Sequence, residues 1–255
     1  IQEAILPTSD YLQNHLRDHF VLFKPKDIVS GDFYWAFASS GKITWAACDC
    51  TGHGVPGAFM SMIGNSLLNE IVVENGISEC DAILNKLREG IIKALSQTGE
   101  SGKQKDGMDM VLCSMDKSKS SLDFSGANNP LWIIRTAGDR INSSLFIEIP
   151  ADKQPIGFFT DEIKSFTKKN IPLQKGDTIY SFTDGFADQF GGPKGKKFKY
   201  SQFKNILLSI QDRSMKEQKE ILNDAIEKWR AWPNPEGGVR NLEQVDDICI
   251  MGVRV

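Results

Sequence analysis

The chain has 255 residues, of which 40% are hydrophobic and 25% charged, with a formal net charge of −3. This length allows one or two domains with a sizeable core, and the composition excludes collagen-like, coiled-coil and disordered proteins. The near balance of 30 basic and 33 acidic residues gives no electrostatic footprint for nucleic acid. We therefore expect a globular protein that binds no nucleic acid.

Two further features bear on location. Ser66, Asn69 and Glu70 interrupt the most apolar helical stretch, so no run approaches the roughly 20 residues of a membrane span. Five cysteines at scattered spacings indicate reduced thiols rather than a disulfide framework. We expect a cytoplasmic domain without membrane contact, while the full-length protein could be membrane-tethered.

The first half of the chain alternates strand and helix signals. A short polar helix is expected over 9–19, followed by strands over 20–23, 32–38 and 43–48, with Gly41 and Lys42 in a hairpin turn. Helical spacing of apolar residues predicts two adjacent helices over 55–75 and 83–95. The stripe predicted for the first helix consists of Phe59, Met62, Ile63, Leu67 and Ile71.

The second half returns to a strand period. Runs over 108–115, 121–125 and 131–135 predict a meander, and a further strand is expected over 177–182. Helices over 200–210 and 215–232 follow, and a strand over 248–255 closes the chain. Strands in hairpins interrupted by paired helices favour an α+β fold of antiparallel sheets packed on helices.

Aspartates stand at the ends of apolar strands in four places. They occur in Gly31-Asp32, at Asp49 within Cys48-Asp49-Cys50, in Thr183-Asp184-Gly185, and in Asp246-Asp247. A single Asp-Gly turn is common and carries little information. Because apolar strands lead into or out of all four, however, a sheet could deliver them to one rim.

Clustered carboxylates repel one another and are costly to bury unless they are protonated or bridged by cations. Aspartate oxygens suit Mg²⁺ or Mn²⁺ rather than zinc. Two such ions would lower the pKa of a bridging water and clamp a phosphoryl oxygen for in-line displacement. The acidic turns therefore predict a binuclear metal site for phosphoryl chemistry.

Other kinds of active site fit the sequence less well. Cys48, Cys50 and His53 resemble a zinc half-site, but the two cysteines face away from Asp49 on a strand and no second cysteine pair is near. A phosphoaspartyl enzyme would need an acid where Thr51 stands. Neither a G-x-S-x-G elbow nor a phosphate-binding G-x-x-x-x-G-K-[ST] loop occurs.

Six segments in order resemble the PP2C-type metal-dependent Ser/Thr phosphatases, in particular the bacterial sporulation and stress-response branch, which is SpoIIE/RsbU-like. They are VSGDFYW (29–35), DCTGHGVPGAFMS (49–61), FSGANNPLW (124–132), DKQPIG (152–157), SFTDGFADQFGG (181–192) and QVDDICIMGV (244–253). The resemblance implies two antiparallel sheets packed face to face and flanked by helices, in α-β-β-α layers. It also implies a centre of two divalent cations, Mn²⁺ or Mg²⁺, at one end of the sandwich.

The resemblance carries over residue by residue to the metal ligands. Asp49 would bridge both ions with the backbone carbonyl of Cys50 as a further ligand, Asp32 would help hold one ion, and Asp184 and Asp246 the other, with Asp247 as an additional candidate. His53 lies near a histidine that protonates the leaving group in relatives, which makes it a candidate general acid.

Phosphate binding departs from the pattern of the eukaryotic relatives. Those enzymes have an acid before the first aspartate and an arginine nearby, whereas Gly31 and Asp27 occupy these neighbourhoods here. Lys24 and Lys26 are candidates by proximity, and Gly54 opens a helix whose amides could attract an anion.

These observations predict a phosphatase that acts on phosphoserine or phosphothreonine of a regulatory protein, such as an anti-sigma antagonist, by a metal-activated water. The alternative is a catalytically silent module of the same fold that binds a phosphoprotein or relays a signal. We expect residues 1–19 to form a helical junction to an upstream sensory region, residues 20–255 to form the phosphatase domain, and the protein to form a homodimer.

Overall fold

The computed structural model describes residues 1–39, 41–98, 105–116, 118, 120–136, 144–159, 164–233 and 239–255. Two five-stranded antiparallel sheets make the centre of the fold, in the orders β1-β14-β9-β6-β7 and β2-β3-β4-β5-β8. The first sheet comprises β1 (His19–Lys24), β6 (Leu131–Arg135), β7 (Leu145–Ile149), β9 (Thr178–Phe182) and β14 (Ile248–Arg254). The second comprises β2 (Phe33–Ser39), β3 (Lys42–Cys50), β4 (Met108–Asp116), β5 (Ser121–Ala127) and β8 (Lys169–Pro172).

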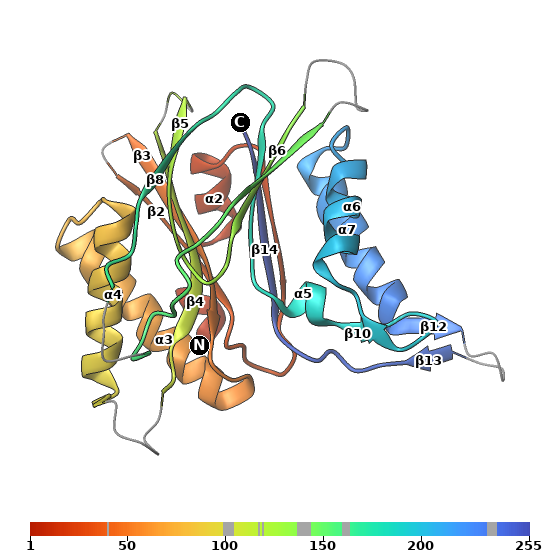
Figure 1. The fold of residues 1–255 in the computed structure, drawn as a ribbon, viewed down its shortest axis with the longest axis horizontal. Helices are drawn as coiled ribbons and strands as arrows, with labels where there is room; N and C mark the ends of the chain where they lie inside the picture. The colour runs from red at the N-terminus through yellow and green to blue at the C-terminus, as the bar shows by residue number, and fades with distance from the viewer. Residues whose placement is uncertain are drawn as a thin grey trace.

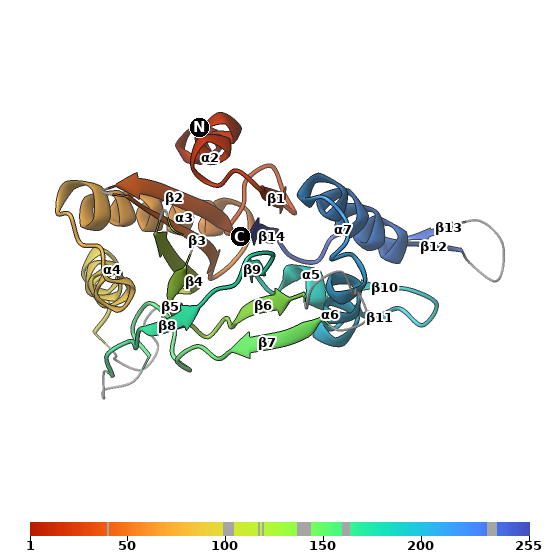
Figure 2. The ribbon, with the colours of Figure 1, turned by 90° about the horizontal axis from the view of Figure 1, so that it is seen from above.

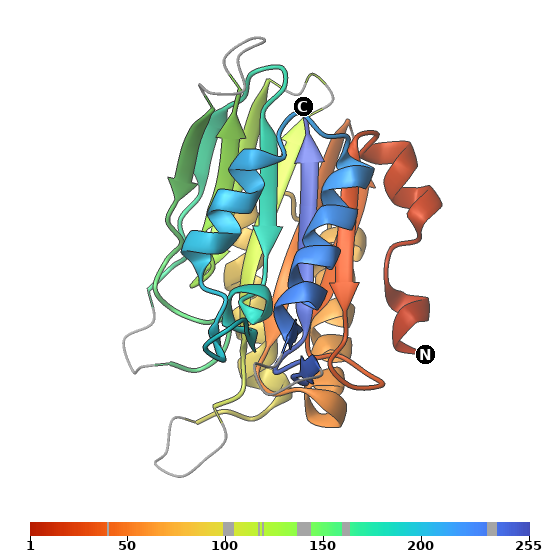
Figure 3. The ribbon, with the colours of Figure 1, turned by 90° about the vertical axis from the view of Figure 1, so that its right-hand side faces the viewer.

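Helices cover the outer face of each sheet, which gives the predicted α-β-β-α layers (Figures 1 and 2). On the β2–β8 sheet lie α3 (Gly54–Leu68), the π-helix η1 (Asn69–Glu74) and α4 (Cys80–Ala94). On the other sheet lie α6 (Tyr200–Ser209) and α7 (Met215–Arg230), which cross its face in Figure 3. The α+β fold prediction is therefore confirmed.

Short elements complete the chain. They are α1 (Gln2–Ile5), α2 (Ser9–His15), α5 (Gly185–Asp188), β10 (Phe190–Gly191), β11 (Lys196–Lys197), β12 (Ala231–Pro233) and β13 (Val239–Asn241). The sequence analysis predicted α2 but none of the other six, nor β7 and β8. Apart from the five-residue β7, the missed elements have two to four residues, which is too short to show a period.

Three apolar clusters fill the spaces between the layers. The cluster between the sheets includes Trp45, Phe124, Ile133, Ile179 and Met251, each at most 1% exposed. The other two lie between each sheet and its helices. Burial of so much apolar surface fixes how the sheets face each other, and with it the relative positions of their strand ends.

The predicted meander is wrong at its third strand. β4 and β5 pair as expected, but β5 then pairs with β8, while β6 pairs with β7 and β9 in the other sheet. The loop Asn128–Pro130 therefore carries the chain from one sheet to the other. A strand period predicts strands but not the sheet to which each belongs.

The face predicted for the first long helix is also partly wrong. Ile63 and Leu67 pack against the core and Ile71 is buried, but Phe59 is 63% exposed and Met62 38% exposed. The buried residues of the helix are Gly57, Ala58, Met60, Ser61, Gly64, Asn65 and Leu68. A Cβ on Gly64 would lie 2.7 Å from Met108, so only the small face of the helix fits this close to the sheet.

The N-terminal helices lie along the edge of the sandwich (Figure 3). Leu12 and Leu16 join the core between the sheets, and the Gln2 side chain accepts a hydrogen bond from the Ser30 amide at 2.9 Å. Residues 1–19 therefore pack on the rest of the fold. The boundary at residue 20 and the role as a junction stay predictions.

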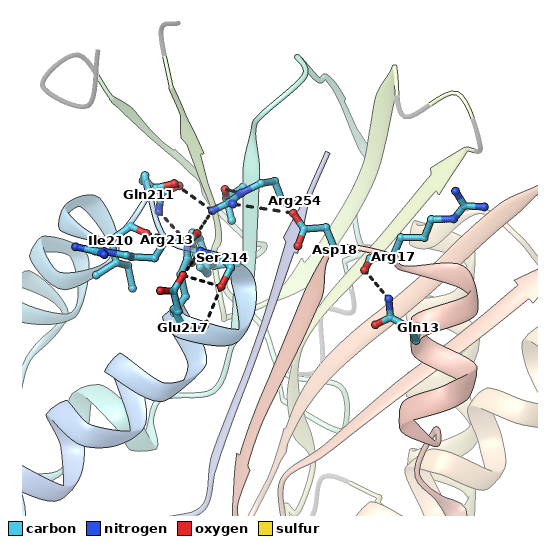
Figure 4. Close-up of polar contacts among 12 residues, drawn as sticks. Gln13, Arg17, Asp18, Ile210, Gln211, Arg213, Ser214, Glu217 and Arg254 are labelled. Carbon is cyan, nitrogen blue, oxygen red and sulfur yellow. Dashed lines mark hydrogen bonds and ion pairs between the residues drawn. The ribbon is translucent and has the colours of Figure 1, made fainter. Parts of the chain in front are cut away.

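At the far end of β14, Arg254 ties the sheet to the helical layer (Figure 4). Its guanidinium donates to the carbonyls of Gln211 at 3.1 Å and Arg213 at 2.9 Å, and lies 4.0 Å from Asp18. Ser214 and Glu217 form a capping box that starts α7 next to this contact. These bonds fix α7 on the sheet at the end opposite to Asp246.

Candidate metal centre and phosphatase site

Five aspartates gather close enough to affect one another's charge, near the residues where α3 and α5 begin. Asp32 directly precedes β2, and Asp109 faces Asp49 across the antiparallel β3–β4 pair. These three belong to the β2–β8 sheet. Asp184 follows β9 and Asp246 precedes β14, so the other two come from the opposite sheet.

The carboxylates repel one another strongly. Burial is the larger cause that raises the pKa of Asp32, and the charge of Asp49 adds to it. Burial, followed by the charge of Asp184, raises the pKa of Asp49. Burial and then Asp246 raise the pKa of Asp184 to about 6. Such shifts arise where like charges share a poorly solvated region.

Hydrogen bonds across the two sheets hold this arrangement. The Thr183 hydroxyl donates to Oδ2 of Asp32 at 2.6 Å, although the two residues are 151 positions apart. The carboxylate of Asp49 accepts the backbone N–H of Asp184. The end of β9 is thereby bonded to acids of the other sheet at two points.

Asp247 differs from its neighbour Asp246. It is 1% exposed, and its two carboxylate oxygens accept the backbone amides of Lys26 and Gly31, both at 2.7 Å. Both oxygens are thus used to hold the loop that leads to Asp32. This geometry favours a positioning role for Asp247, and its place among the ligands stays a prediction.

Two glycines allow the acidic turns to approach one another. A Cβ on Gly185 would lie 1.9 Å from the carbonyl oxygen of Asp247, and one on Gly31 would lie 2.3 Å from that of Gly52. Both neighbours are backbone atoms, so a side chain at either position would displace a turn. The carbonyl of Cys50 also lies beside Gly31, next to Asp32.

His53 lies at the solvent-exposed edge of the cluster. Its Nδ1 is 3.1 Å from Oδ2 of Asp27, and its Nε2 is 3.0 Å from the ammonium of Lys26. The charges of His53 and Lys26 act on Asp246 and partly offset the rise in its pKa, of which burial is the largest cause. Both residues are therefore placed beside the acids.

Of the three candidates for phosphate binding, Lys24 is engaged by another element, whereas Lys26 and Gly54 lie near the acids. Lys24 donates to Asn223 at 2.8 Å and pairs with Glu227 at 2.8 Å, so α7 engages its ammonium. Gly54 begins α3 with a φ of 63°, directly after His53. Lys26 and the first backbone amides of α3 thus lie beside the acids. Their role in binding phosphate stays a prediction.

The cysteine thiols take no part in the site. Cys48 and Cys50 are buried in the apolar cluster under α3, on the face of β3 away from Asp49 as predicted. Burial is the largest cause that raises the pKa of both thiols. His53 is exposed and paired with other residues, so the zinc interpretation finds no support.

The donors present fit hard divalent cations. They are carboxylate oxygens, burial raises their pKa values, and none of the five forms an ion pair within the described residues. In the part of the chain that the structure describes, no three acidic, histidine or cysteine side chains already stand close enough together to hold a metal ion. The ligand set is therefore a prediction supported by the donor chemistry and by the clustering of the acids.

Sequence analysis missed three residues of this region. Asp109 accepts a hydrogen bond from the side-chain amide of Asn128 at 2.8 Å, and its charge helps to raise the pKa of Asp49. Thr183 was read only as part of a turn. Tyr200 packs against Trp132 and Phe182, and burial followed by Asp184 raises the pKa of its phenol. Only the strand register and the helix packing bring these three to the site.

The chain is similar to solved phosphatase structures. The SiaA-PP2C domain of Pseudomonas aeruginosa is 29% identical, with a TM-score of 0.82 over 100% of this chain and 92% of that one. The PP2C phosphatase domain with a fragment of the regulatory domain of SpoIIE from Bacillus subtilis is 20% identical, with a TM-score of 0.69 over 93% of this chain and 62% of that one.

A third similar structure contains the RsbU and RsbW domains of Rv1364c from Mycobacterium tuberculosis. It is 20% identical, with a TM-score of 0.63 over 93% of this chain and 59% of that one. Among curated protein sequences, no significant match was found.

The family model of stage II sporulation protein E (SpoIIE) matches residues 39–255. This match covers most of the chain and includes the turns that carry Asp49, Asp184 and Asp246. It favours the predicted enzyme over the catalytically silent alternative. The chain therefore belongs to the SpoIIE family and is a PP2C-type protein serine/threonine phosphatase.

Proposed function

We propose that this domain removes phosphate from phosphoserine or phosphothreonine of a regulatory protein, such as an anti-sigma antagonist, using two divalent cations, Mn²⁺ or Mg²⁺. The observation that carries the proposal is the convergence of Asp32, Asp49, Asp184 and Asp246, from both sheets, in one poorly solvated region. When bound, the cations would offset the charge of these acids and supply an activated water as nucleophile.

The chain's own residues would perform the remaining tasks. Asp49, Asp32, Asp184 and Asp246 would hold the cations together with the Cys50 carbonyl. Lys26 and the amides at the start of α3 would attract the phosphate dianion. His53 would give a proton to the departing serine or threonine oxygen, since its imidazole lies at this edge beside Lys26.

The experiment replaces Asp49 or Asp184 with asparagine. Each change removes a charged oxygen ligand at similar volume, so we expect Mn²⁺-dependent hydrolysis of a phosphoserine peptide to fall below detection while the circular dichroism spectrum stays the same. Asp224→Asn, on the exposed side of α7, is the matched control and should leave turnover unchanged. Undiminished turnover in Asp49→Asn and Asp184→Asn would refute the site.

Other parts of the prediction concern the cellular setting. The five cysteines are free and buried, which supports a reducing compartment such as the cytoplasm. None of the helices in the described part of the chain has the length and apolar content that a membrane crossing requires. The upstream sensory region and the homodimer stay predictions.

A further inference from the structure

The first long helix displays apolar residues to solvent beside the acids. Val55 is 62% exposed, Phe59 63% and Met62 38%, and their spacing of four and three residues places them on one face of α3. We call these three residues the α3 stripe. The buried residues of α3 are Gly57, Ala58, Ser61, Gly64 and Asn65 together with Met60 and Leu68, so the helix carries apolar side chains on its exposed face as well as on its buried one.

Close packing explains the buried face but not the exposed one. Gly57 and Gly64 allow α3 to approach the loop after β3 and the β2–β8 sheet, where a Cβ would lie 2.2 Å and 2.7 Å from other atoms. Nothing in that packing requires phenylalanine and methionine on the outside. Contiguous exposed apolar surface of this kind is typical of sites that bind another molecule.

The stripe is continuous with the catalytic face. Val55 comes two residues after His53, which contacts Asp27 and Lys26 at the edge of the acid cluster. The next residue of that loop, Ile28, has a fully exposed side chain, at 101% of its reference area. Two exposed apolar residues, Val55 and Ile28, thus closely follow the His53 and Asp27 positions that meet at the edge of the acid cluster.

Distances along the chain decide what can reach the stripe. Counted from His53 at the edge of the acids, Phe59 lies about 9 Å and Met62 about 14 Å along the helix axis, at 1.5 Å per residue. An extended peptide advances about 3.3 Å per residue, so residues about two to four positions from a phosphoserine held at the acids would contact the stripe.

We propose that the α3 stripe, with Ile28, binds an apolar side chain that lies two to four residues from the phosphoserine of the protein substrate. A protein phosphatase must receive a folded or extended protein on the face that carries its acids, and the stripe begins on that face. Within the α3 stripe, Phe59 has the largest side chain and is 63% exposed, so it contributes most of the selectivity. This proposal rests on the proposed function and adds a substrate class to it.

The test uses the complete domain with Mn²⁺ and a set of phosphoserine peptides. The reference peptide has serine at the second, third and fourth positions on each side of the phosphoserine. In each other peptide, leucine replaces one of these serines. We expect one or more leucine peptides to show a kcat/KM about tenfold above that of the reference. In Phe59→Ala/Met62→Ala this preference should disappear.

Two controls separate docking from chemistry. Hydrolysis of p-nitrophenyl phosphate, which is too small to reach the stripe, should be the same in the double variant and the wild type. Leu145→Ala removes a similarly exposed side chain, 57% exposed, at the end of β7 distant from Asp184, and should keep the leucine preference. Alanine is a good helix former, so the double variant should fold.

Each other outcome overturns the proposal. If kcat/KM of the wild type is the same for all leucine peptides and the reference, the stripe does not bind the substrate. The same conclusion follows if the double variant keeps the preference for leucine. A dimer by light scattering that the double variant converts to a monomer assigns the stripe to a second copy of the chain. Absence of metal-dependent hydrolysis of p-nitrophenyl phosphate by the wild type would instead refute the proposed function, and the docking proposal with it.

Discussion

Thr183 donates a 2.6 Å hydrogen bond to Asp32 and so joins the end of β9 to the start of β2. Its hydroxyl oxygen also accepts the buried amide of Cys249 at 2.9 Å. One side chain therefore satisfies a carboxylate of one sheet and an amide of the other. The bond matters for function because Asp32 is 2% exposed and has no cationic partner among the described residues.

We expect Thr183→Val to lower the free energy of unfolding of the metal-free protein by about 2 kcal/mol, because two buried polar groups lose their partner. The midpoint of thermal unfolding should fall by about 4–8 °C for a chain of this size. Thr183→Ser keeps the hydroxyl and should retain most of the stability. Unchanged stability in Thr183→Val would show that the hydroxyl does not contribute.

The acid cluster should make the metal-free protein sensitive to pH. Burial and Asp246 raise the pKa of Asp184 from an ordinary value of 3.8 to about 6, so the folded chain holds this proton more tightly than the unfolded chain. The resulting stabilisation is fully present below pH 3.8 and is lost as the pH rises through about 6.

This effect is isolated by comparing the wild type with Asp184→Asn in EDTA. We expect the two unfolding midpoints to be similar near pH 4 and the variant to become the more stable as the pH rises to 7, because it lacks the repelling charge. Addition of Mn²⁺ should stabilise the wild type more than the variant. A difference that is independent of pH would contradict the shifted pKa.

Gly185 should tolerate no side chain. In Gly185→Ala the new Cβ would lie 1.9 Å from the Asp247 carbonyl oxygen, so the turns that carry Asp184 and Asp246 must move apart. A displacement of about 1 Å in such a site typically costs about 100-fold in rate, and we expect a loss of that order in kcat/KM. Gly76→Ala is the control, since no atom lies within 4 Å of its Cβ. It should cost some stability but no activity.

The general-acid role of His53 has a distinct kinetic signature. In the structure its Nε2 faces the Lys26 ammonium at 3.0 Å, and an arriving phosphate dianion would attract that ammonium and free the nitrogen for a proton. We expect His53→Gln to lower kcat for a phosphoserine peptide by about 100-fold, a typical share for general acid catalysis. Hydrolysis of p-nitrophenyl phosphate, whose leaving group needs no proton, should change little. An equal fall for both substrates would assign His53 a structural role.

The strand and helix periods predicted most of the longer elements of this fold. The existence of the hairpin at Gly41, of the paired helices and of the closing strand follows from local sequence pattern and turn residues. Sheet membership was not predictable in the same way. β5 and β6 are separated by only a few residues, yet they lie in different sheets, and the packing between the sheets decides this.

The site was predicted in part. The strand-end aspartates and the six ordered segments indicated which acids would meet, while Asp109 needed the register of β3 and β4, and Thr183 needed the contact of the two sheets. The outward position of Phe59 could not be read from spacing, because the period of a helix does not say which face its neighbours leave room for.

The division of the acids between two sheets gives the cations a mechanical as well as a chemical task. Ions held by Asp32 and Asp49 of one sheet and by Asp184 and Asp246 of the other would link the two sheets of the sandwich. A displacement of one sheet relative to the other would then separate these ligands and stop turnover, even if no molecule bound at the site. Conversely, loading with Mn²⁺ would lock the two halves in register.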